Sequence, residues 1–104
     1  MFIFLASMQE QKKKNIHIIS IGGSIMHDLA INLKKNGNNI SGSDDVIYDP
    51  SKSKLEKNGI LPKELGYYKK NIGEHIDLVI TGMHTKKNNI ELKEAKEKGI
   101  PIKS

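Results

Sequence analysis

Two adjacent glycines, Gly22 and Gly23, separate an apolar segment from an amphipathic one in the stretch "SIGGSIMHD". Glycines at such a junction let an anion approach the backbone closely, and the free N–H groups at the start of a helix can bind it. The pattern therefore indicates a phosphate or diphosphate cradle over residues 22–26. The dinucleotide fingerprint G-x-G-x-x-G has two further glycines, where this chain has Ser20 and Ile25.

Three interpretations of this stretch remain open from its glycines alone: an altered dinucleotide loop, a loop for another phosphate, or a plain turn. The third glycine of the fingerprint normally permits close packing of helix on strand. We therefore expect the bulkier Ile25 to move the following helix slightly outward from the sheet.

Two other polar segments follow apolar runs and add side-chain chemistry. Asp44 lies 22 residues beyond Gly22, where an acidic side chain commonly meets a ribose hydroxyl. The segment "TGMH", residues 81–84, ends the apolar run "DLVI". Because ligands bind outside the carboxyl ends of parallel strands, we expect residues 20–26, 41–45 and 81–84 to lie together.

The remaining polar residues give no catalytic pattern. The four histidines lack metal-ligand spacing, and the chain has no Ser–His–Asp set, no paired-carboxylate site and no G-x-x-x-x-G-K-[ST] loop for ATP. His17 and His75 are expected to be structural, whereas His27 and His84 are candidates either for ligand contacts or for ordinary surface positions. Tyr67 and its neighbour are expected to contribute to packing.

Apolar periodicity predicts the elements that position these segments. We expect strands at residues 15–21, 38–44, 60–61, 77–81 and 100–103, and helices at 24–36, 50–58 and 90–98. Ser24, Asp49 and either Asn88 or Asn89 are the expected N-caps, and Gly37, Gly59 and Gly99 the expected stops. This alternation predicts an α/β fold, a Rossmann-like open parallel sheet of about five strands flanked by helices.

Length and composition set further bounds. A chain of 104 residues forms one small domain, and the absence of cysteine excludes disulfides and suits the cytoplasm. The net charge of +5 comes from 17 lysines without any arginine, so we expect no nucleic-acid partner. The apolar run at residues 2–6 is too short for a secretory signal or a membrane span, and residues 1–14 are expected to be a disordered extension.

The three ligand-end segments resemble one known family. Ile16–Met26, "IHIISIGGSIM", and Ile40–Asp44, "ISGSD", are similar to the Mur ligase patterns I-H-F-I-G-I-G-G-S-G-M and V-S-G-S-D. Ser20 and Ile25 are the departures. The closing "NNIELKEAKEKGIPIKS" resembles the family's N-P-E-L…A…G-I-P segment, with Ile90 in place of proline. The likeness covers residues 15–104 and is greatest to the branch of UDP-N-acetylmuramate–L-alanine ligase and murein peptide ligase.

This resemblance implies the N-terminal, UDP-sugar-binding domain of an ATP-dependent amide-forming ligase of peptidoglycan synthesis or recycling. The implied partner is UDP-N-acetylmuramic acid or a UDP-muramoyl peptide. ATP and magnesium would belong to a central domain absent from this chain, so no catalytic residue is expected here. The implied ligand-binding residues are Gly22, Gly23, Ser24, Ile25 and Met26 at the diphosphate, Ser43 and Asp44 at the uridine end, and Thr81, Gly82, Met83 and His84 beside the muramoyl group.

Two other functions remain as alternatives. A regulatory domain that binds NAD or a related dinucleotide would use the same glycine loop, and an interaction module would use it only as a turn. The S-G-S-D segment and the two-glycine pattern favour the UDP-sugar interpretation.

Overall fold

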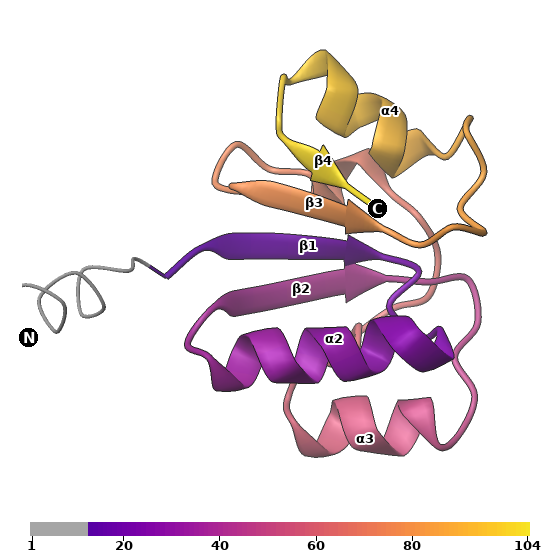
Figure 1. Cartoon of the computed structure of the whole chain (residues 1–104). Coiled ribbons are helices and arrows are strands. Elements are labelled where there is room, and N and C mark those ends of the chain that lie inside the picture. The colour runs from indigo at the N-terminus through magenta and orange to yellow at the C-terminus, as the bar shows by residue number, and fades with distance from the viewer. Residues whose placement is uncertain (1–12) are drawn as a thin grey trace, which may run out of the picture.

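The computed structural model describes residues 13–104 and contains one parallel sheet of four strands (Figure 1). The strands are β1 (Asn15–Ile19), β2 (Asn39–Ser43), β3 (Leu78–Thr81) and β4 (Ile102–Lys103), in the spatial order β2-β1-β3-β4. The α/β class and the parallel sheet are thus confirmed. Nearly all of the expected N-terminal extension lies outside the described residues.

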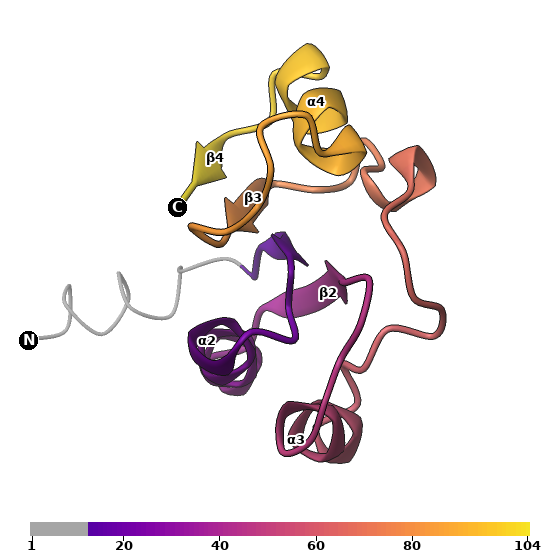
Figure 2. The same ribbon diagram turned by 90° about the vertical axis from the view of Figure 1, so that its right-hand side faces the viewer.

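The helices cover both faces of this sheet (Figure 2). Helices α2 (Ser24–Lys35) and α3 (Ser51–Lys57) lie on one face, and α4 (Ile90–Glu97) lies on the other with the short 3-10 turn η1 (Lys69–Asn71). Alternate side chains of β1 point to opposite faces, so Ile18 belongs to the core under α2 and Ile19 to the core under α4. The central strand is therefore buried from both sides.

The prediction of a fifth strand at residues 60–61 is wrong, and the backbone shows the physical reason. Gly59 has a φ of 73° and ends α3. The N–H of Ile60 then donates to the Leu55 carbonyl of that helix, so it is not available to a neighbouring strand. Ile60 is buried against the α2 face of the sheet. Its apolar character thus reflects core packing, and Pro62, which lacks an N–H, cannot extend a ladder.

Two of the expected helix caps also differ from the structure. Gly23, not Ser24, occupies the N-cap of α2, and Ser24 is the first helical residue. Pro50 occupies the N-cap of α3, yet the Asp49 carboxylate still accepts the N–H of Ser53 at 2.9 Å. Asn89 caps α4 as expected, with its side chain accepting the N–H groups of Glu91 and Leu92.

The expected outward shift of α2 at Ile25 is not supported, because this side chain does not pack between helix and sheet. Ile25 is 79% exposed, whereas Ala30 and Ile31 make the buried contacts of the same helix. Position 25 therefore faces away from the sheet, and the size of its side chain is not limited by the core.

A buried carboxylate joins α4 to the inner strand β1 and the edge strand β2. Glu91 is fully buried, and its Oε1 accepts hydrogen bonds from His17 of β1 (2.7 Å) and Ser43 of β2 (2.5 Å). Its Oε2 accepts the N–H of Tyr68 and the side-chain amide of Asn71, each at 2.8 Å. Five elements or segments thus meet at one side chain, and His17 has the structural position that was expected.

The pKa of Glu91 reflects two opposing effects. Burial alone would raise the pKa, but the hydrogen bonds from His17, Ser43, Asn71 and the Tyr68 backbone outweigh it and hold the pKa below its ordinary value. A depressed carboxyl pKa contributes stability above the ordinary glutamate range, and this contribution is lost as the pH falls through the folded-state value.

We predict that Glu91→Gln lowers the free energy of unfolding by about 2 kcal/mol or more near neutral pH, because charge-assisted hydrogen bonds are replaced by weaker ones. The deficit should shrink in acid, as the pH falls through the lowered folded-state pKa of Glu91 and the wild-type carboxylate also becomes protonated. Urea unfolding at neutral and at acidic pH measures it. Glu97→Gln, on the exposed side of the same helix, is the matched control and should change stability by less than about 0.5 kcal/mol. Equal losses in the two variants would contradict the role given to Glu91.

Candidate functional site

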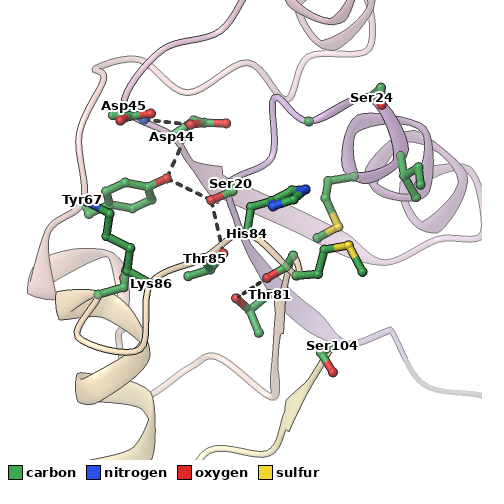
Figure 3. Close-up of a pocket in the computed structure, with 16 residues that line it drawn as sticks. Ser20, Ser24, Asp44, Asp45, Tyr67, Thr81, His84, Thr85, Lys86 and Ser104 are labelled. Carbon is green, nitrogen blue, oxygen red and sulfur yellow. Dashed lines mark hydrogen bonds between the residues drawn. The ribbon is translucent and has the colours of Figure 1, made fainter.

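A cavity of about 810 Å³ lies at the carboxyl ends of the strands (Figure 3). One wall is the start of α2, and the opposite wall is the loop between β3 and α4, residues 82–88, here called the rim loop. Asp44 after β2 and Tyr67 from the loop that precedes η1 close a third side. The three segments expected to meet, at residues 20–26, 41–45 and 81–84, therefore do meet.

The structure places all but two of the predicted ligand-binding residues around this cavity. The predicted residues that line it are Gly23, Ser24, Ile25, Met26, Asp44, Thr81, Gly82, Met83 and His84. The exceptions are Gly22 and Ser43, neither of which lines the cavity. Ser43 is 1% exposed, and its hydroxyl donates to Glu91 beneath the sheet edge.

Gly22 does not line the cavity but holds the Asp44 carboxylate that does. Its N–H donates to Asp44 Oδ2 at 2.9 Å, and a Cβ at this position would lie 2.9 Å from both that oxygen and Ile47 Cγ1. The absence of a side chain thus lets the glycine loop pack directly on the segment after β2. We call this contact the loop bracket (Gly22–Asp44).

Asp44 is 8% exposed and is held by backbone donors on both sides. Its Oδ1 accepts the N–H of Asp45 at 2.9 Å, opposite the contact from Gly22. The pKa of Asp44 is raised mainly by burial and to a smaller extent by the neighbouring Asp45 side chain. The backbone hydrogen bonds oppose this rise. The carboxylate is therefore fixed in place at the cavity wall.

A row of hydroxyl groups crosses the cavity floor, and no pattern in the sequence indicates that these groups meet. Ser20 Oγ lies 2.9 Å from Tyr67 OH and 3.3 Å from Thr85 Oγ1, and Tyr67 OH donates to Asp44 Oδ1 at 3.4 Å (Figure 3). Burial raises the pKa of Tyr67, which keeps the phenol protonated. Tyr67 also packs against the core under α4, as expected, but its hydroxyl belongs to the site.

Ser20 holds a backbone conformation that favours glycine. Its φ is 66°, and β1 ends just before it at Ile19, two positions earlier than expected. The family pattern has glycine here, and the positive φ gives the physical reason. At this turn the Ser20 hydroxyl lines the cavity, while the N–H groups of Ile21 and Gly22 donate to the Ser43 carbonyl and the Asp44 carboxylate.

The other cavity residues missed from the sequence are Asp45, Lys86, Asn89 and Ser104. Asp45 lies within the predicted segment 41–45 but had no assigned role, and Lys86 lies two residues past His84. Asn89 was identified only as a possible cap, and Ser104 follows the predicted strand at residues 100–103, whose carboxyl end lies at the same edge of the sheet.

The two histidine candidates have different environments. His27 is 4% exposed, and its Nδ1 lies 2.9 Å from the Gly23 carbonyl and 3.1 Å from Ser51 Oγ, so it joins α2 to α3 and is not a surface residue. His84 is exposed on the rim loop and lines the cavity. Within residues 13–104 no cluster of acidic or histidine side chains could hold a metal ion. None of the helices described there has the length and apolar character to cross a membrane.

Fold and cavity together define a Rossmann-like α/β domain with a ligand-sized space at its strand ends. The family model described as "Mur ligase family, catalytic domain" matches residues 15–104. The chain is 38% identical over 89 residues to the UDP-N-acetylmuramate–L-alanine ligase of Syntrophomonas wolfei, covering 86% of this chain and 19% of that protein. Against the ligase of the same name from Clostridium kluyveri it is 40% identical over 91 residues, covering 88% and 20%.

Solved structures give the same result. A murein peptide ligase from Psychrobacter arcticus superimposes with a TM-score of 0.79 at 31% identity, covering 88% of this chain and 19% of that one. The UDP-N-acetylmuramate–alanine ligase of Thermotoga maritima gives a TM-score of 0.76 at 30% identity, covering 86% and 20%. The chain belongs to the Mur ligase family, and it spans about a fifth of the length of these relatives.

We predict that Gly22→Ala lowers the free energy of unfolding by about 1–3 kcal/mol, because the new Cβ overlaps Asp44 and Ile47 and opens the loop bracket. Gly23→Ala is the matched control one residue away. A Cβ there has no neighbour closer than 3.6 Å, and the φ of −60° suits alanine, so its cost should stay below about 1 kcal/mol. Denaturant unfolding compares the two, and equal costs would contradict the bracket.

We predict that Ser20→Gly is more stable than Ser20→Ala by about 1 kcal/mol. Both variants lack the hydroxyl, and only alanine keeps a Cβ at the positive φ, so their difference isolates the backbone strain. Thermal and urea unfolding of the two variants measure it. Equal stabilities would show that the turn relaxes and that the positive φ carries no cost.

Proposed function

We propose that this domain binds UDP-N-acetylmuramic acid or a UDP-muramoyl peptide for a ligase of peptidoglycan synthesis or recycling. The observation that carries the proposal is the joining of three chemically different walls around one cavity: a helix N-terminus, a fixed carboxylate and a rim loop. A diphosphate-linked nucleoside and sugar has groups suited to each wall. The names of the relatives supply the particular ligand.

The start of α2 is the proposed diphosphate site. The first N–H groups of a helix have no carbonyl partner in a preceding turn, which leaves those of Ser24, Ile25 and Met26 free for an anion. Gly23 adds no side chain at the N-cap, so a phosphate can approach the backbone. These backbone donors lie at the positive end of the α2 dipole, so they can bind a diphosphate although the chain has no arginine.

The carboxylate of Asp44 is the proposed contact for the uridine end. Its Oδ atoms accept two backbone N–H groups and retain lone pairs for a ligand N–H or hydroxyl donor. Gly22 and Ser43 support this end indirectly, since Gly22 holds Asp44 and Ser43 joins the end of β2 to Glu91. Thr81, Gly82, Met83 and His84 then lie beside the muramoyl group.

The chemistry of amide formation is assigned to the rest of the ligase. The described residues contain the proposed binding groups, and we place ATP and magnesium in a central domain beyond this segment. The domain is then a substrate-binding part that is not catalytic alone. We propose the cytoplasm as its location, in keeping with a chain that has no cysteine.

We predict that UDP-N-acetylmuramic acid and UDP raise the melting temperature of the 104-residue chain, while NAD and ATP do not. Ligand at about 100 times its dissociation constant stabilises by about 2.7 kcal/mol, which is on the order of 10 °C in a domain of this size. A shift with NAD alone would identify a dinucleotide-binding regulatory domain, and no shift with any ligand would favour an interaction module.

Asp44→Asn should weaken uridine binding about tenfold, because a charged acceptor is lost while the side chain keeps an oxygen for Gly22. Asp28→Asn is the matched control, since Asp28 is exposed on α2 away from the cavity lining. Titration calorimetry measures both affinities. Equal affinities in the two variants would remove Asp44 from the ligand site.

A further inference from the structure

The Ser20 side chain connects two loops that are distant in sequence. Its hydroxyl lies 2.9 Å from Tyr67 OH, 47 residues away, and 3.3 Å from Thr85 Oγ1, 65 residues away. Tyr67 is anchored through its neighbour, since the Tyr68 N–H donates to the buried Glu91. Ser20 therefore lies between a fixed loop on one side and the rim loop on the other (Figure 3).

The rim loop has few other connections to the body of the domain. Its backbone hydrogen bonds are local turns, from the Thr85 N–H to Gly82 and from the Asn89 N–H to Lys86. Within residues 13–104, the contact between Thr85 and Ser20 is the hydrogen bond that joins a rim-loop side chain to a different part of the chain. Met83 and His84 are highly exposed, so packing adds little to hold this loop.

The serine keeps this contact at a position where glycine would be less strained. Its φ of 66° is unfavourable for any residue with a Cβ. The glycine of the family pattern relieves this strain and cannot reach Thr85. The serine at position 20 thus departs from the family pattern, and its hydroxyl makes a contact that glycine cannot make.

We propose that Ser20 is a positioning residue that holds the rim loop at the cavity floor, and that this supports binding of the sugar half of the ligand. The loop contact stands on the geometry alone, whereas the effect on the sugar half rests on the proposed function. Met83 and His84 would be placed by this contact beside the muramoyl group, while the UDP half binds elsewhere, at α2 and Asp44.

Amide hydrogen exchange tests the loop contact without any ligand. Ser20→Ala, Ser20→Gly and Thr85→Val should each raise exchange at the Thr85 and Asn89 amides about three- to tenfold, the range expected for loss of one hydrogen bond. Thr85→Ser keeps the hydroxyl and should behave as wild type. The Val79 amide, which donates to Pro101 within the sheet, is the internal reference and should be unchanged relative to wild type.

The double variant Ser20→Ala with Thr85→Val should exchange no faster at these amides than either single variant, because both remove the same contact. Ser20→Gly, which relieves the strained turn, preserves the test if the alanine variant fails to fold. Unchanged exchange in Ser20→Gly and Thr85→Val, or faster exchange in Thr85→Ser, would overturn the contact.

Binding then tests the second half of the proposal. Thr85→Val should weaken UDP-N-acetylmuramic acid about three- to tenfold and change UDP affinity less than about twofold. Equal losses for the two ligands would overturn the assignment to the sugar half. If wild-type chain binds neither ligand, the proposed function fails, while the exchange experiment still decides whether Ser20 holds the loop.

Discussion

The buried carboxylate of Glu91 is the interaction on which the architecture of the site depends. A charge with no exposure to water is tolerated only when its oxygens are fully hydrogen-bonded, and Glu91 obtains its donors from two strands, a loop and η1. Those donors are distant in the chain and must assemble together. Because Glu91 lies in the first turn of α4, the same contacts fix where the rim loop ends.

The cavity is built above this cluster from groups of a different kind. The polar groups around it include backbone N–H groups, hydroxyls and the Asp44 carboxylate. The chain has no arginine, so these groups must supply the polar contacts that arginine often makes. Such groups bind weakly one by one, so their value depends on being held in place before a ligand arrives. The loop bracket (Gly22–Asp44) and the row from Ser20 to Tyr67 supply that preorganisation.

This arrangement suits a domain whose task is to hold a substrate for chemistry performed elsewhere. The Mur ligase relatives are about five times as long as the chain, and the described residues provide a cavity, a helix N-terminus and a fixed carboxylate. The proposed division places recognition of the UDP-sugar here and amide formation in the remaining domains. Ser20 and Ile25, which differ from the family pattern, both line the cavity, and neither lies in a strand.

The sequence by itself determined the alternating strands and helices, the parallel sheet and the three segments at its carboxyl edge, because these follow from local periodicity, glycine stops and chain order. Tertiary structure alone decided which side chains face the cavity. It exposed Ile25, turned Ser43 toward Glu91, buried His27 between two helices and brought Tyr67 and Thr85 to Ser20. Such contacts join residues tens of positions apart through irregular loops, where neither helical nor strand periodicity constrains a side chain's direction.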